Sequence, residues 1–106
     1  MMINEVFRAL GDPTRRDILV LLRGGDKSAG EIAERFPLAR STLSGHFNVL
    51  KAAGLVVAER RATTVVYSLN QGAFEEALGA VMELMGVGEA KSEPRFPKEK
   101  PHEELA

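Results

Sequence analysis

Two short helical patterns separated by a brief break occupy residues 28–54, and they constrain the fold more than any other feature of the chain. The break is Phe36-Pro37-Leu38-Ala39, and the layout is typical of a helix-turn-helix. Residues 35–61 carry five basic side chains and one acidic side chain, a local charge of +4 in a chain whose total is −1. A local positive excess of this kind suits a phosphate backbone.

Length and composition limit the classes of protein to consider. With 106 residues, 44% of them apolar, the sequence predicts one domain with one modest core. The absence of cysteine excludes disulfides, thiolate metal sites and thiol catalysis. The start of the chain lacks the pattern of a signal peptide, and no stretch approaches the roughly 18 apolar residues of a membrane span. We therefore expect a soluble cytoplasmic protein with no membrane insertion.

Charge and proline content divide the chain at residue 86. Residues 1–86 are predicted to form the folded domain, whereas residues 87–106 hold three prolines and nine charges of both signs. Such a segment buries too little apolar surface to offset its ordering entropy, so it is predicted to be a flexible tail. The alternative is a partner-binding peptide centred on Phe96.

Three helices are predicted before the break at residues 36–39, and the third of them is the first helix of the central pair. Apolar residues at helical spacing over 3–10 predict a first helix that ends near Gly11. Asp12 followed by Pro13 predicts the start of a second helix, which Gly24-Gly25 closes. Ser28 and Glu31 fit a capping box for the third helix, which is expected to run to about Arg35.

The pattern changes after Gly54. Runs rich in β-branched residues at 55–58 and 64–69 flank Glu59-Arg60-Arg61-Ala62-Thr63, which predicts a β-hairpin with a basic tip. From residue 73 an amphipathic last helix extends to Gly86. The predicted fold is therefore mainly α with a β-hairpin wing, a winged helix-turn-helix in the order ααααββα.

The second helix of the pair has two different sides. At helical spacing Leu43, Phe47 and Leu50 share one side, and the other side is small and polar. Small side chains let a helix backbone approach base edges in the major groove. The alternative is an ordinary solvated helix face. The candidate DNA-binding residues of this helix and of the hairpin are Arg40, Ser41, Thr42, Ser44, Gly45, His46, Asn48, Lys51, Arg60 and Arg61.

Three side chains outside this face have open roles. His46 lies at the core edge and is either a hydrogen-bonded structural histidine or a phosphate contact. Arg15 and Arg16 either contact phosphate or pair with Asp12 and Asp17, and the nearby acids favour a structural or mixed role. No catalytic constellation is found, so no enzymatic activity is predicted.

Four stretches resemble the ArsR family of bacterial repressors, and within it the short metal-independent autorepressors of SdpR type. They are residues 7–19, residues 30–33, residues 44–51 with 53–56, and residues 67–69. The resemblance implies a winged-helix repressor with double-stranded DNA as its partner. A protein or small-molecule effector stays open. The alternative function is a winged-helix protein-interaction module without a specific DNA site.

The resemblance also implies a homodimer formed by the first and last helices, whose apolar faces are hard to bury within one protomer. Intramolecular packing of these faces is the alternative. A two-fold dimer places two recognition helices about one DNA turn, roughly 34 Å, apart and so fits an inverted repeat. The residues assigned to the dimer contact are Ile3, Val6, Phe7, Leu10, Phe74, Leu78, Val81, Met82 and Met85.

The chain departs from the family pattern in three places. Many relatives sense metals through cysteines on the third helix or through Asp, His and Glu on the last helix, and neither set is present here. We therefore expect no metal and no other cofactor. The family often has Ser where this chain has Ala39, so the cap of the recognition helix is weaker or has moved to Ser41. The hairpin tip lacks the usual Gly, which leaves its geometry open.

Overall fold

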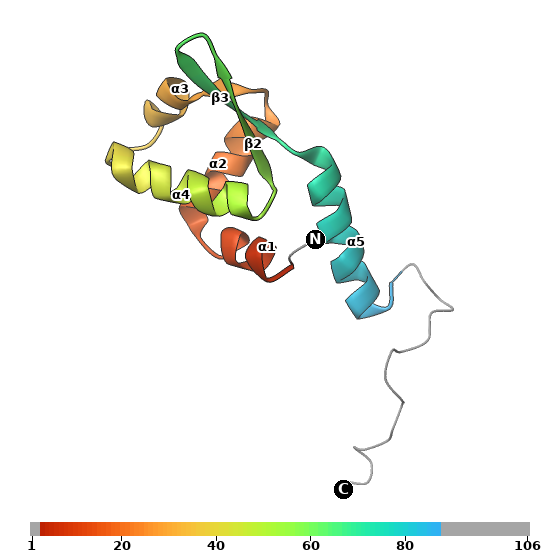
Figure 1. Ribbon diagram of the computed structural model, residues 1–106. Coiled ribbons are helices and arrows are strands. Elements are labelled where there is room, and N and C mark those ends of the chain that lie inside the picture. The colour runs from red at the N-terminus through yellow and green to blue at the C-terminus, as the bar shows by residue number, and fades with distance from the viewer. Residues whose placement is uncertain (1–2, 88–106) are drawn as a thin grey trace, which may run out of the picture.

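The computed structural model describes residues 3–87, in which helices enclose one face of a small sheet and the last helix extends away from it (Figure 1). Beyond Val87, the predicted tail lies outside the described residues. The elements are, in order, α1 (Ile3–Leu10), α2 (Pro13–Arg23), β1 (Lys27–Ser28), α3 (Ala29–Ala33), α4 (Arg40–Ala52), β2 (Val56–Arg61), β3 (Thr64–Leu69) and α5 (Gln71–Met85). None of the helices in this part of the chain is long and apolar enough to cross a membrane.

Local capping sets most helix ends where the sequence predicts them. The Asp12 carboxylate accepts hydrogen bonds from the backbone N–H groups of Thr14 and Arg15, at 2.8 and 3.2 Å. Ser28 and Glu31 form the predicted capping box, each side chain accepting from the other residue's N–H. Because α3 ends at Ala33, it is shorter than the expected helix.

The sheet has one more strand than the sequence predicts. β2 and β3 form the antiparallel hairpin, and the two-residue β1 pairs with the other edge of β3, giving the order β1-β3-β2. The element order is therefore ααβααββα rather than ααααββα. Two residues are too few to show a strand periodicity, so this strand has no sequence signal of its own.

The hairpin tip is tighter than the five-residue tip expected from the sequence. Arg61 lies opposite Thr64 in the strand register, so the connection is Ala62-Thr63 alone. Ala62 adopts a left-handed backbone conformation, with φ of 59°. A side chain in this conformation costs roughly 1–2 kcal/mol relative to glycine. The departure from the family's glycine is thus accommodated with local strain.

The core draws side chains from all five helices and from the hairpin. Ile18 of α2, Ile32 of α3, Leu43 and Leu50 of α4 and Leu55 are its largest fully buried members. The rings of Phe47 and Tyr67 stack with centroids 4.2 Å apart, which joins α4 to β3. α5 contributes a single buried residue, Ala77, to this core.

Candidate nucleic-acid interface

α4 separates a buried apolar side from an exposed polar side. Leu43, Phe47 and Leu50 are at most 5% exposed and hold the helix against the core. The predicted groove-facing residues are all exposed, namely Arg40, Ser41, Thr42, Ser44, Gly45 and Asn48. A Cβ added at Gly45 would meet no atom within 4 Å, so the middle of the helix offers an open backbone surface. This is the shape that a major groove requires.

The start of α4 has no side-chain cap. Ala39 is the N-cap residue, and its carbonyl accepts the first helical hydrogen bond from Leu43 N–H at 3.0 Å. The cap has therefore not moved to Ser41, which lies inside the helix. Uncapped N–H groups at a helix start favour anions such as phosphate.

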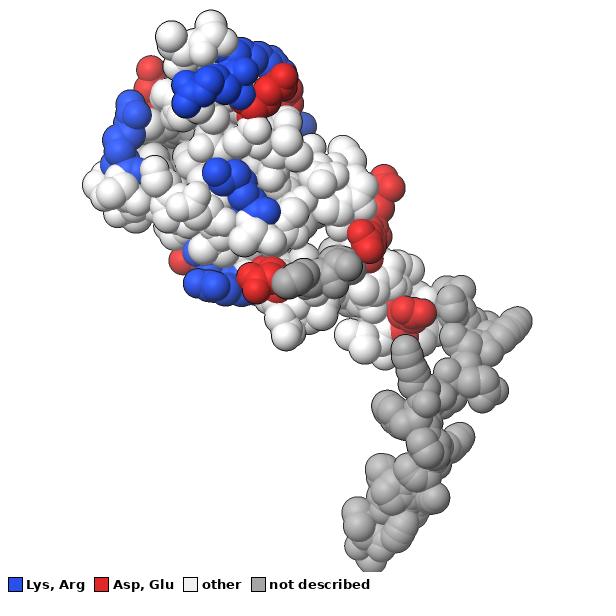
Figure 2. Space-filling model, viewed as in Figure 1, with Lys and Arg blue, Asp and Glu red and all other residues white. Residues whose placement is uncertain are grey.

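Figure 2 shows basic side chains over the hairpin and α4, a further basic group at the α1 end, and acidic side chains both beside the hairpin and along α5. Arg40, Lys51, Arg60 and Arg61 are all exposed. Arg61 pairs with Glu59, with Nη2 3.1 Å from Oε1 in a solvent-exposed contact. Because side chains alternate along a strand, Arg60 projects from the opposite face of β2, the face of the buried Val56. The two wing arginines are therefore not equivalent.

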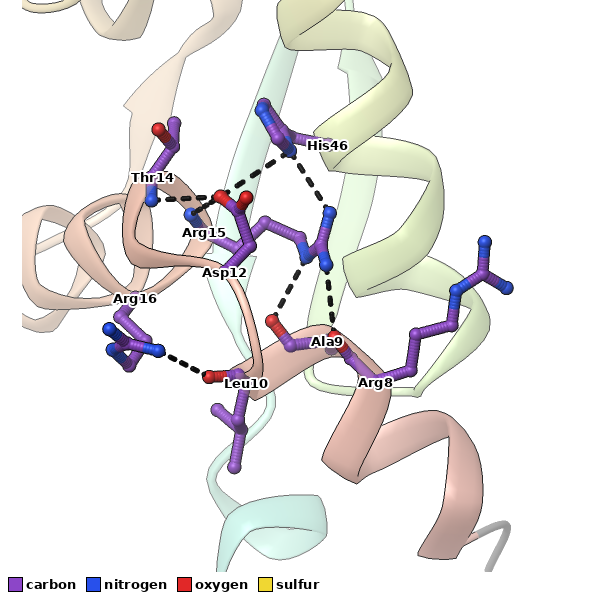
Figure 3. Close-up of polar contacts among 8 residues, drawn as sticks. All are labelled: Arg8, Ala9, Leu10, Asp12, Thr14, Arg15, Arg16 and His46. Atoms are coloured by element: carbon purple, nitrogen blue, oxygen red, sulfur yellow. Dashed lines mark hydrogen bonds and ion pairs between the residues drawn. The ribbon is translucent and has the colours of Figure 1, made fainter.

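One guanidinium joins α1, α2 and α4 behind this face (Figure 3). Arg15 Nε donates to the Ala9 carbonyl and Nη2 to the Arg8 carbonyl, both at 2.9 Å. Its Nη1 lies 3.1 Å from Nδ1 of His46. His46 therefore has the hydrogen bond expected of a structural histidine, and its side chain is only 16% exposed.

The neighbouring arginine is bound in a simpler way. Arg16 Nη1 donates to the Leu10 carbonyl at 2.8 Å. Both guanidinium groups therefore hydrogen-bond backbone carbonyls at the end of α1, which is the structural role expected of them. The C-terminal carbonyls of a helix lack intrahelical donors, so they attract such cations.

Asp12 completes the cluster at the start of α2. Desolvation raises the pKa of its carboxyl, but the backbone N–H groups of Arg15 and Thr14 and the charges of His46 and Arg15 lower it more. The pKa therefore lies below its ordinary value. A lowered carboxyl pKa stabilises the fold at neutral pH, and this contribution is lost as the pH falls below about 4.

The residues assigned to the dimer contact differ widely in exposure. Phe7, Leu78 and Met85 are 48%, 60% and 68% exposed. Ile3, Leu10, Phe74, Val81 and Met82 are half-buried. Val6 is 2% exposed and belongs to the protomer's own core, so its assignment to a surface contact is wrong. The helical spacing of α1 does not distinguish the side facing α4 from the side facing solvent.

Two exposed apolar side chains at the end of α5 were not assigned to the dimer contact from the sequence. Leu84 is 77% exposed near the end of α5, and Val87 follows the helix at 45%. Leu84 follows Ala77 by seven residues and so lies at the edge of the apolar face, and Val87 lies beyond the glycine that ends the helix. Within residues 3–87 no group of three or more His, Asp and Glu side chains is placed to hold a metal ion.

Residues 12–57 match the model of the bacterial regulatory protein family arsR, a segment that runs from the cap of α2 to the start of β2. Over 82% of its length the chain is 39% identical to the transcriptional repressor SdpR of Bacillus subtilis, and it covers 97% of that protein. The chain belongs to the ArsR family. It is 40% identical over 74% of its length to the regulator CmtR of Mycobacterium tuberculosis, of which it covers 66%.

Solved structures of ArsR-family proteins share the fold. An ArsR-like transcriptional regulator from Rhodococcus sp. RHA1 superposes with a TM-score of 0.69 and 34% identity, over 79% of this chain and 76% of that one. This ArsR-family protein is therefore a DNA-binding transcriptional regulator and not an enzyme, as the sequence predicts. The alternative of an interaction module without a DNA site is not supported.

Proposed function

We propose that this regulator is a homodimeric repressor that occupies an inverted repeat in promoter DNA. The observation that carries the proposal is the exposed, small and polar face of α4 beside four exposed cations. The similarity to SdpR, a transcriptional repressor, supports repression rather than activation of transcription. Occupying a promoter is the simplest way for so small a protein to repress.

Each part of the interface has a role in this proposal. α4 enters the major groove, where Asn48 and the serine and threonine hydroxyls contact base edges. Lys51 and the wing arginines bind phosphates on either side. His46 contacts a phosphate through the ring nitrogen that Figure 3 shows directed away from Arg15.

The second copy is proposed to cover the exposed apolar side chains of α1 and α5. Phe7, Leu78, Leu84, Met85 and Val87 are all at least 45% exposed, and α1 contacts α5 in the same protomer. Large exposed apolar groups on neighbouring elements typically mark protein interfaces. Residues 62–86 carry three acids and no cation, so this end of the molecule is suited to face away from DNA.

Footprinting on the DNA upstream of the protein's own gene tests the proposal as a whole. We expect two protected half-sites related by a two-fold axis, with centres about one helical turn apart. Binding should persist in excess competitor DNA. A protein that competitor DNA displaces completely, or that protects a single asymmetric site, contradicts the proposed repressor.

Arg60→Ala is expected to weaken binding to all DNA sequences and to flatten its salt dependence. Each phosphate contact contributes about 0.9 to the slope of log K against log salt, so a dimer that loses two contacts changes by about 1.8. Arg23→Ala is the matched control, because Arg23 is exposed at the far end of α2. Equal slopes for the two variants would place the wing away from DNA.

Asn48→Ala is expected to change which base is preferred at one position of each half-site. A good bidentate contact contributes roughly 1–3 kcal/mol of discrimination. Affinity for the operator should fall while affinity for unrelated DNA and the salt slope stay unchanged. Binding to a panel of operators with single base changes measures the effect, and a uniform loss across the panel would contradict it.

Gly45→Ala is expected to act with opposite signs on folding and on binding. Replacing glycine inside a helix with alanine stabilises it by up to about 1 kcal/mol, and the new methyl has open space here. The same methyl would stand between α4 and the groove floor. Urea unfolding and operator titration of one preparation should therefore show higher stability and weaker binding, and unchanged binding would move the groove contact away from Gly45.

A further inference from the structure

The Arg15 side chain hydrogen-bonds both α1 and α4. Two of its nitrogens bind carbonyls in the last turn of α1, and the third lies 3.1 Å from His46 on α4. His46 directly follows Gly45 and precedes Asn48 by two residues. The contact therefore reaches the turn of α4 that bears the central groove-facing positions.

α4 depends on tertiary contacts for its position. It has no side-chain cap, and Gly45 interrupts its middle with a residue of low helix propensity. Leu43, Phe47 and Leu50 fix its depth in the core, but apolar packing is not directional. A hydrogen bond at the edge of that core adds a directional constraint.

The chemistry of the pair also determines which ring nitrogen carries the proton. A guanidinium can only donate, so Nδ1 of His46 must accept, and the proton of the neutral ring lies on Nε2. Nδ1 is also 4.0 Å from the Asp12 carboxylate. Figure 3 shows Nε2 directed away from both partners. The contact between Arg15 and His46 thus leaves the Nε2–H group of His46, in a fixed direction, to donate to a group outside the protein.

We propose that Arg15 is a positioning residue for DNA recognition, which ties the end of α1 to α4 and orients His46 with Nε2–H as a donor to phosphate. Arg15 itself is not assigned a contact with DNA in this arrangement, because its Nε, Nη1 and Nη2 each have a partner within the protein. The inference rests on the proposed function of α4 as the recognition helix. It makes α1, which is proposed to lie in the dimer contact, part of the support for the groove-reading surface.

Arg15→Met and Arg16→Met form a matched pair that isolates the link to α4. Both variants lose one cation and hydrogen bonds to α1 carbonyls, two for Arg15 and one for Arg16, but only Arg15 also reaches α4. We expect Arg15→Met to bind the operator at least tenfold more weakly than Arg16→Met, with the salt slope of the wild type. Affinities are scaled to the folded fraction measured by circular dichroism. Equal affinities would overturn the proposal, and so would a slope reduced by about 0.9 per protomer, which would make Arg15 a phosphate contact.

Imidazole nitrogen spectra supply a readout that does not depend on DNA. In the free wild-type protein, at a pH where the ring is neutral, we expect the His46 ring to show an unprotonated Nδ1 and a protonated Nε2, and in Arg15→Met a mixture of the two tautomers. A fixed Nε2–H tautomer in both proteins would overturn the orienting role. If Arg15→Met does not fold, His46→Phe with and without Arg15→Lys provides a double-mutant cycle, in which additive effects on operator affinity overturn the link.

Failure of the proposed function would look different from failure of this inference. If Asn48→Ala and Arg60→Ala leave DNA binding unchanged, α4 and the wing are not the interface. If those variants weaken binding while Arg15→Met matches Arg16→Met, the interface stands and the positioning role is wrong.

Discussion

Leu78→Glu is expected to convert the regulator to a monomer and to weaken operator binding by about 10²- to 10⁴-fold. Leu78 is 60% exposed on α5, so a carboxylate there is solvated in the free protomer but buried in the proposed dimer. Burying an unpaired charge is costly, and two equivalent charges would meet across a two-fold axis. A monomer also loses the gain in effective concentration that joins two half-site contacts.

Analytical ultracentrifugation and operator titration measure the two effects in one preparation. Val20→Glu is the matched control, because Val20 is 54% exposed on α2 and is not one of the residues assigned to the contact. The control should stay dimeric and bind as the wild type does. A Leu78→Glu protein that remains a dimer would show that the apolar residues of α5 serve another partner.

Leu50→Ala is expected to lower the free energy of unfolding by about 2–5 kcal/mol, a large part of the 5–15 kcal/mol typical of a domain. Leu50 is fully buried where α4 meets the core, so the truncation leaves a cavity that the surrounding helices cannot fill. At roughly 4–8 °C for each kcal/mol in a domain of this size, the melting temperature should fall by more than about 8 °C.

Thermal unfolding at one fixed protein concentration tests this, since the stability of a dimer depends on concentration. Leu38→Ala is the control, because it removes the same atoms from a residue that is 37% exposed between α3 and α4. The control should cost under about 1 kcal/mol. Equal losses for the two leucines would contradict the assignment of Leu50 to the centre of the core.

Most of the fold could be predicted because its signals are local. Asp12 caps α2, Ser28 and Glu31 cap α3, and Gly86 ends α5 in a left-handed conformation at φ 76°, each through contacts spanning a few residues. Such signals act in the unfolded chain almost as they do in the folded one. The two-residue β1 has no such signal, because it forms only by pairing with β3 some 40 positions later.

The sequence predicted which residues of the candidate site are exposed, but not the contacts that hold those residues in place. Helical spacing alone separates the buried Leu43, Phe47 and Leu50 from the exposed Ser44 and Asn48. Spacing does not reveal that the Arg61 guanidinium pairs with the Glu59 carboxylate. Nor does it reveal that α1 buries Val6 and exposes Phe7.

The chain's pattern was enough to establish the helix ends, the polar face of α4, the basic hairpin and the family, because each depends on neighbours along the backbone. The role of Arg15 emerges from packing, since its contact with His46 joins residues 31 positions apart. Such a contact requires α1, α2 and α4 to be in place before its donor and acceptor meet. Its energy is a property of the assembled helices, so no local pattern of residues encodes it.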